Sequence, residues 1–186
     1  PIGLIVGGVV LLIFVTWFFS TWNLLFREEE NANKSWSDID FILKQRYDMI
    51  ANIISLEKGY AEHERELFAQ FAQARQTAAG CLAQGDVKGV GAAEGILSGM
   101  LPRINMVAEQ YPDLKADTSF VNLQNQLVSL ENQLADRREF YNASSTNFNS
   151  AIQMIPTNFV AGFKGCTRRE LFVIDAVQRE NVQISF

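Results

Sequence analysis

The chain begins with an apolar segment, residues 1–26, that contains no charged side chain. As a helix this segment would be roughly 36–39 Å long, which exceeds the ~30 Å hydrocarbon core of a bilayer. Its few polar residues gather near Trp17 and Trp22, at the end where an interfacial aromatic belt is expected. The apolar segment stops abruptly at Arg27, which is followed by three glutamates. This pattern predicts a single transmembrane anchor.

A cleaved signal peptide and a buried core helix are the two alternatives to the anchor. A signal peptide has basic residues before a shorter apolar stretch and small residues at its cleavage site, and residues 20–22 make a poor site. A core helix is rarely apolar on every face over such a length. We therefore favour the anchor.

The basic residues near the predicted anchor bear on its orientation. None precedes the apolar segment, whereas four follow it closely: Arg27, Lys34, Lys44 and Arg46. By the positive-inside rule, the rest of the chain is expected in the cytoplasm, although the acidic residues 28–30 weaken this interpretation.

Apolar residues then recur every three or four positions, which is typical of a core-facing helix. The repeating positions are Trp36, Ile39, Leu43, Arg46, Ile50, Ile53, Glu57, Tyr60, Glu64, Leu67, Phe71, Ala74 and Ala78. No proline interrupts residues 2–101. We therefore expect one continuous helix from the anchor to about Ala79, with Gly59 as its weakest point.

A glycine-rich stretch follows, and residues 80–91 are predicted to form a loop. A second helix is expected over residues 92–110, with a kink or restart at Pro102. Glycines recur every fourth residue at positions 91, 95 and 99, which favours close packing against a neighbouring bundle helix.

A third strongly periodic segment begins after Asp117, a good N-cap residue, and Pro156 ends it. Its apolar positions keep a three-four alternation over five heptads, as in coiled-coil packing. The predicted fold is all-α: an anchor over residues 1–26, an antiparallel up-and-down bundle of about four helices over residues 27–155, and an irregular tail over residues 156–186.

Composition argues against several classes of function. The net charge is −5 and no basic stripe occurs, so a nucleic-acid partner is not expected. Cys81 and Cys166 lie far apart, and the single histidine, His63, has no second histidine four residues away. These spacings predict no zinc site and no disulfide framework. We therefore expect no enzyme activity, no metal and no cofactor.

Four charged residues fall within the apolar stripes: Arg46, Glu57, Glu64 and Arg137. Burying an unpaired charge costs several kcal/mol, so these side chains are expected to pair across helices or to lie at a stripe's edge. A pair between Arg137 and Glu57 or Glu64 would fix the helix register. The alternative is a polar groove between helices that binds a ligand.

Several motifs resemble the LemA family of bacterial membrane proteins over residues 23–186. The sharpest matches are residues 46–53, 58–64, 74–75, 108–116 and 131–142, together with Pro156, Asn158, Phe163 and the final Phe186. Ala51 departs from the family, which usually has proline there. The resemblance implies an N-terminal anchor, a bundle of about four helices and a cytoplasmic domain, and it implies no reaction, cofactor or catalytic residue. One branch of the family is associated with magnetosome formation, and no motif assigns this chain to that branch.

Two hypotheses for function follow. The first is a scaffold or accessory subunit, anchored by a single span in the bacterial cell membrane, that acts through contacts with a protein partner or with copies of itself. The second is a module that senses a ligand or lipid through the polar groove around Arg46, Glu57, Glu64 and Arg137.

Overall fold

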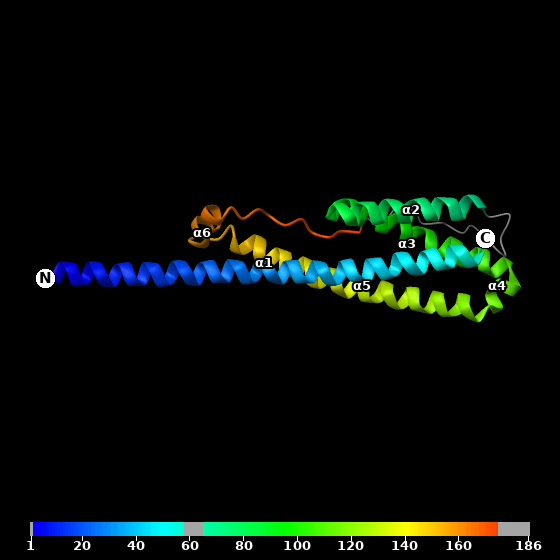
Figure 1. The fold of residues 1–186 in the computed structure, drawn as a ribbon, viewed down its shortest axis with the longest axis horizontal. Coiled ribbons are helices and arrows are strands. Elements are labelled where there is room, and N and C mark those ends of the chain that lie inside the picture. The colour runs from blue at the N-terminus through cyan, green and yellow to red at the C-terminus, as the bar shows by residue number, and fades with distance from the viewer. Residues whose placement is uncertain (1, 58–64, 175–186) are drawn as a thin grey trace, which may run out of the picture. The chain divides into compact units, whose positions relative to one another are not determined.

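The computed structural model describes residues 2–57 and 65–174, and every regular element in these ranges is a helix. This confirms the all-α prediction. The elements are α1 (Ile2–Glu57), α2 (Arg65–Gln84), α3 (Val87–Gln110), α4 (Pro112–Ala116), α5 (Thr118–Ala151) and α6 (Thr157–Lys164), shown in Figure 1.

The chain forms two compact units. The anchor unit consists of residues 1–37 and 139–171, and the bundle unit consists of residues 38–138 and 172–186. Helices α1 and α5 each contribute residues to both units.

In the anchor unit, the first part of α1 is long and apolar enough to cross a membrane, as judged by length and composition. None of its most apolar window is buried within the chain. Further along, Leu25 packs against Val160 and Ala161 of α6. Beyond that contact, the rings of Trp36 and Tyr141 lie 5.2 Å apart and join α1 to α5.

In the bundle unit, α1, α2, α3 and α5 reverse direction at successive connections, as expected for an up-and-down bundle (Figure 1). Their apolar stripes meet in a common core, because a helix with one apolar face is stable only when that face is covered. The core includes Ile39, Leu43, Ile50, Ile53, Phe71, Leu97, Ile104, Leu127, Leu130 and Leu134.

The prediction of one continuous helix to Ala79 is wrong. Arg75 Nε on α2 donates to the backbone carbonyl of Tyr47 on α1 at 2.6 Å. In one straight helix these residues, 28 positions apart, would be separated by about 42 Å. The chain therefore turns back between α1 and α2, because the apolar faces of the two segments can then cover each other. Residues 58–64, which include Gly59, lie outside the described residues.

The expected loop over residues 80–91 is also wrong. Helix α2 continues to Gln84, and only Gly85 and Asp86 separate it from α3. Gly85 adopts a left-handed conformation with φ of 69°, which allows a sharp reversal at little steric cost. Asp86 caps α3 by accepting a hydrogen bond from Gly89 N at 2.9 Å. A glycine-rich composition was therefore compatible with two helix ends and a very short turn.

Gly91 makes a close contact, although not with a bundle helix as its spacing suggested. A Cβ placed on Gly91 would lie 2.0 Å from the backbone oxygen of Val173, so the C-terminal tail passes directly over this position. The neighbouring Phe172 is fully buried. Gly99 has no neighbouring atom within 4 Å of such a Cβ. Helix α3 continues through Pro102 without restarting.

Helix α5 begins as predicted, because the Asp117 carboxylate accepts hydrogen bonds from Ser119 N at 2.7 Å and Phe120 N at 3.4 Å. It ends at Ala151, before the predicted stop at Pro156. A short helix, α6, occupies part of the tail, and residues 165–174 are irregular as expected. In the anchor unit, Asn149 holds this tail through two hydrogen bonds with the backbone of Arg169, at 2.7 and 2.9 Å.

The hydrogen bond from Arg75 to the Tyr47 carbonyl predicts how well the chain tolerates proline at position 51. Proline at position 51 would remove the N–H that bonds this carbonyl within α1, yet Arg75 Nε already donates to the same oxygen. We expect Ala51→Pro to destabilise the chain clearly less than the ~3 kcal/mol typical of proline inside a helix. Asn52→Pro is the matched control, because it frees the adjacent carbonyl of Asp48. Urea unfolding in detergent, followed by circular dichroism, measures both. Equal losses would contradict the proposed compensation.

Candidate functional site

Several polar side chains of the bundle unit surround the guanidinium group of Arg46, a residue that is 1 % exposed. Its Nη1 donates to the carboxylate of Glu94 on α3. Its Nη2 donates to Ser98 Oγ on α3 at 3.0 Å and to Glu131 Oε1 on α5 at 2.9 Å. One side chain of α1 thus binds two other helices. We call Arg46, Glu94, Ser98 and Glu131 the Arg46 cluster.

Helical periodicity explains why these side chains converge. Arg46 follows Leu43 by three residues and precedes Ile50 by four, so it lies on the buried face of α1. Glu94 follows Val90 by four residues and precedes Leu97 by three, and both of these neighbours are buried on α3. The sequence therefore places a cation on one apolar stripe and an acid on another. Only the packing of the helices decides that they meet.

Burial governs the ionisation of Glu94, which is completely buried. Removal from water raises the pKa of the Glu94 carboxyl above its ordinary value, and the positive charge of Arg46 partly offsets this effect. Burial, with the negative charge of Glu94 adding to it, raises the pKa of the Tyr47 hydroxyl far above its usual range. Burial therefore opposes the ionised form of Glu94, and it keeps the Tyr47 hydroxyl neutral.

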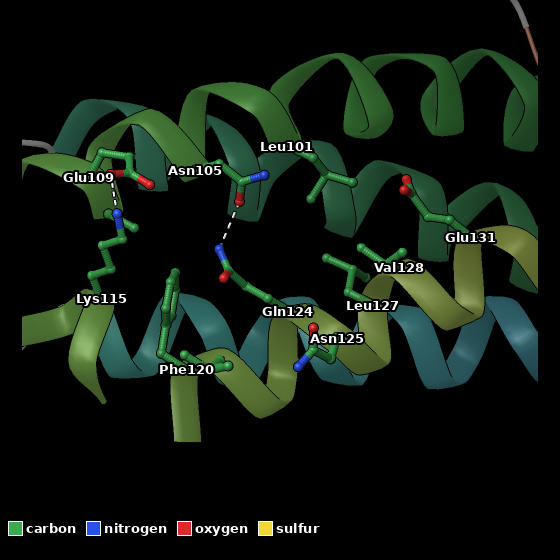
Figure 2. Close-up of a pocket in the computed structure, with 12 residues that line it drawn as sticks. Leu101, Asn105, Glu109, Lys115, Phe120, Gln124, Asn125, Leu127, Val128 and Glu131 are labelled. Atoms are coloured by element: carbon green, nitrogen blue, oxygen red, sulfur yellow. Dashed lines mark hydrogen bonds and ion pairs between the residues drawn. The ribbon is translucent and has the colours of Figure 1, made fainter. Parts of the chain in front are cut away.

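A groove of about 450 Å³ lies between α3 and α5, with α4 at one end. Figure 2 shows Asn105 and Gln124 pointing toward each other, with an amide hydrogen bond of 2.8 Å between them. Glu109 on α3 and Lys115 on α4 form an ion pair of 2.5 Å. Glu131 lines the groove and also binds Arg46, so it connects this accessible surface with the buried cluster.

The structure describes the side chains of two of the four candidate residues proposed from the sequence, and these two differ in their burial. Arg46 is buried, whereas Arg137 is 53 % exposed and lies 3.6 Å from the Asp38 carboxylate. The side chain of Glu57 and the whole of Glu64 lie outside the described residues, so their pairing stays a prediction.

Two acids in the Arg46 cluster, Glu94 and Glu131, were missed by sequence reasoning. A usable signal existed, because Glu94 occupies a stripe position of α3 between Val90 and Leu97. Glu131 lies four residues after Leu127 and three before Leu134, again on the buried side of its helix.

The described side chains offer little chemistry beyond ion pairing. Within residues 2–57 and 65–174, no group of three His, Cys, Asp or Glu side chains could hold a metal ion. Cys81 and Cys166 are free and half-buried. His63 lies outside the described residues. The arrangement is suited to holding helices in register and to presenting a groove.

Comparison with known proteins gives a consistent family match. The model of the LemA family matches residues 35–186. Magnetosome protein MamQ of Magnetospirillum gryphiswaldense is 23% identical, with 87% of this chain and 68% of that protein covered. Magnetosome protein MamQ 2 of Paramagnetospirillum magneticum is 24% identical, with 91% and 71% covered. Protein LemA of Metamycoplasma hominis is 26% identical, with 88% and 74% covered. None of these names describes an enzyme.

The Arg46 cluster predicts that replacing Arg46 lowers the free energy of unfolding much more than replacing Arg137. Arg46→Met would leave Glu94 buried without its main cation, and we expect a loss of about 3–5 kcal/mol in the free energy of unfolding. Arg137→Met is the control, because its half-exposed pair with Asp38 should contribute only about 0–1 kcal/mol. Chemical unfolding in detergent measures both variants. Similar losses for the two would show that the cluster does not constrain the bundle.

The raised pKa of Glu94 predicts a specific pH dependence. Because the folded chain holds this proton more tightly, the associated stabilisation is present below the ordinary glutamate value of 4.5 and is lost as pH rises through the folded pKa. Relative to Glu94→Gln, the native chain should therefore become less stable as pH rises above about 4.5, by at most ~1.4 kcal/mol per pH unit. Glu131 remains to pair with Arg46 in the variant. A difference in unfolding free energy that stays constant with pH would contradict this assignment.

Proposed function

This chain belongs to the LemA family, and we propose that it is a membrane-anchored helical scaffold or accessory subunit that acts through protein–protein contacts. The observation that carries the proposal is the form of α1. Its apolar first part is exposed throughout, and the same helix continues without a break into the core of the bundle unit. A helix of this kind fits a bilayer at one end and a folded domain at the other.

The exposed part of α1 supports membrane anchoring on energetic grounds. Most side chains over residues 2–15 are large, apolar and exposed. Moving one such side chain out of water contributes roughly 1.5–3 kcal/mol, so the segment as a whole strongly favours lipid. With its basic residues after the segment, the chain is proposed to lie in the bacterial cell membrane with the bundle on the cytoplasmic side.

The groove between α3 and α5 supports contact with another protein. Val121 and Val128 line it and are 41 % and 57 % exposed, and they lie seven residues, or about two helical turns, apart on α5. The amides of Asn105 and Gln124 line the same groove (Figure 2). Apolar side chains mixed with amides are typical of a protein interface, whereas the described residues of the groove include no nucleophile paired with a base.

A second candidate function is sensing of a small ligand in the same groove. The observation that favours it is the position of Glu131, which lines the groove and binds the buried Arg46. A ligand that draws the Glu131 carboxylate away would weaken an ion pair connecting α1 and α5. Such a ligand would act on the bundle through Glu131, whereas a protein docked on the valines need not contact this carboxylate.

The test is isolation of the full chain from native membranes after mild solubilisation, with identification of the proteins that accompany it. Val128→Arg places a charge in the groove, and Asn122→Arg places the same charge on an exposed position of α5 outside the groove lining. We expect the native chain and Asn122→Arg to retain the same partner or self-association. Val128→Arg should lose most of it.

Three other outcomes would redirect the proposal. If the native chain shows neither a partner nor self-association, the scaffold function is wrong. If Val128→Arg keeps its partner, the contact lies elsewhere on the surface. If a small molecule raises the melting temperature of the native chain and fails to do so for Glu131→Gln, ligand sensing is the better description.

A further inference from the structure

Four large apolar side chains are exposed on α6 and in the turn before it, in the anchor unit. On α6, the buried Val160 and Ala161 face Leu25 of α1, beside which α6 lies (Figure 1). Phe159 and Phe163, four residues apart and therefore on one face, are 70 % and 80 % exposed. We call the exposed set the tail apolar surface: Met154, Ile155, Phe159 and Phe163.

The position of this surface along α1 is fixed by an aromatic contact. The ring of Phe163 lies 6.3 Å from the ring of Phe18, edge to face. Phe18 precedes Phe26, the last residue of the apolar segment, by eight residues, which is about 12 Å along a helix. Phe163 therefore lies beside the apolar segment itself, not beyond its charged end.

Lys164, the residue after Phe163, reaches in the opposite direction. Its Nζ lies 5.4 Å from the centre of the Phe26 ring and 2.6 Å from the Glu29 carboxylate. A lysine that passes along apolar rings while its charge meets a carboxylate beyond them behaves as a snorkelling side chain at a membrane boundary. Of two adjacent residues on α6, Phe163 therefore contacts the apolar part of α1, and Lys164 contacts the position at which α1 changes from apolar to charged.

We propose that α6 and the turn before it insert the tail apolar surface into the same lipid bilayer that receives the N-terminal segment. The chain then has a second, interfacial membrane contact beside its anchor. The inference rests on the proposed function, because it requires the N-terminal segment to lie in the membrane. Insertion removes large exposed apolar side chains from water, which favours the lipid-bound state.

Continuity with the apolar segment identifies lipid as the occupant. Within the tail apolar surface, Phe163 adjoins Phe18, so lipid that surrounds α1 at this level also meets Phe163. Interfacial helices typically place their apolar face about 5–10 Å below the headgroup boundary, and the ~12 Å between Phe18 and the end of the segment is slightly deeper than this range. A protein partner on this surface would have to displace lipid from Phe163 and from the neighbouring Phe18.

The experiment measures the depth of nitroxide labels on the full chain in vesicles of phosphatidylcholine and phosphatidylglycerol. In a background with Cys81→Ala and Cys166→Ala, single cysteines carry the label in Phe159→Cys or Phe163→Cys. Collisions with oxygen, which concentrates in lipid, are compared with collisions with a water-soluble nickel chelate. We expect an oxygen-to-nickel ratio several-fold higher at both positions than at a control position in water.

Phe140→Cys supplies the matched control. Phe140 is also an exposed phenylalanine of the anchor unit, at 60 %. Its neighbour Tyr141 packs on Trp36, which lies ten residues, or about 15 Å, beyond Phe26 along α1. A label at Phe140 is therefore expected in water whether or not α6 inserts.

Val10→Cys separates failure of this inference from failure of the anchor. If Val10 reports lipid while Phe159 and Phe163 resemble Phe140, the inference is wrong and the anchor stands. If Val10 also reports water, the proposed anchor itself is wrong. Protection of Phe159 and Phe163 from both reagents would overturn the proposal in favour of a protein partner. Helical circular dichroism confirms the fold of each labelled variant, and the two positions test the surface independently.

Discussion

The bundle unit is organised around one buried cation. The guanidinium of Arg46, on α1, contacts Glu94 and Ser98 on α3 and Glu131 on α5, and it is almost completely removed from water. Because unpaired buried charges cost several kcal/mol, the helices are constrained to positions at which these groups meet. A slip of one helical turn, about 5.4 Å, would separate them. An all-apolar core would allow such slips more readily.

Helix α2 is held by a different contact. Arg75 donates to a backbone carbonyl of α1 and lies 3.9 Å from the Asp48 carboxylate. Together, Arg46 and Arg75 join α1 to each of the other three long helices of the bundle unit. Helix α1 is therefore the element on which register depends, and it is also the element that carries the apolar N-terminal segment.

The anchor unit relies on other interactions. Aromatic pairs and small apolar contacts join α1 to α5 and α6, and Asn149 holds the irregular tail by pairing with the backbone of Arg169. The ion pair of Lys164 with Glu29 lies where the apolar segment of α1 gives way to charge. This division between apolar and charged side chains is what a lipid–water boundary selects, and it supports the membrane-anchored role proposed for the chain.

The sequence by itself determined that the long segments are helical and which of their faces are apolar, although it did not separate α1 from α2. Uninterrupted apolar residues predicted the exposed segment of α1, and three-four spacing predicted the buried faces of α1 and α5, because helical periodicity is a local property of the chain. Arg46 was recognised for the same reason. Its pairing was not, because the sequence showed acids on several stripes and gave no measure of which stripes face each other.

Tertiary structure alone decided where the chain reverses and what meets across helices. Helix α2 returns along α1 because the apolar faces of the two helices then cover each other. The free energy of this burial is not part of the local helix propensity of either segment. The turn at Gly85 and Asp86 replaced a longer expected loop because a single capped reversal let both helices extend their packing. Likewise, Gly91 met the tail at Val173 instead of a helix, and α6 placed Phe163 against Phe18, since contacts between residues so distant in sequence exist only in the folded chain.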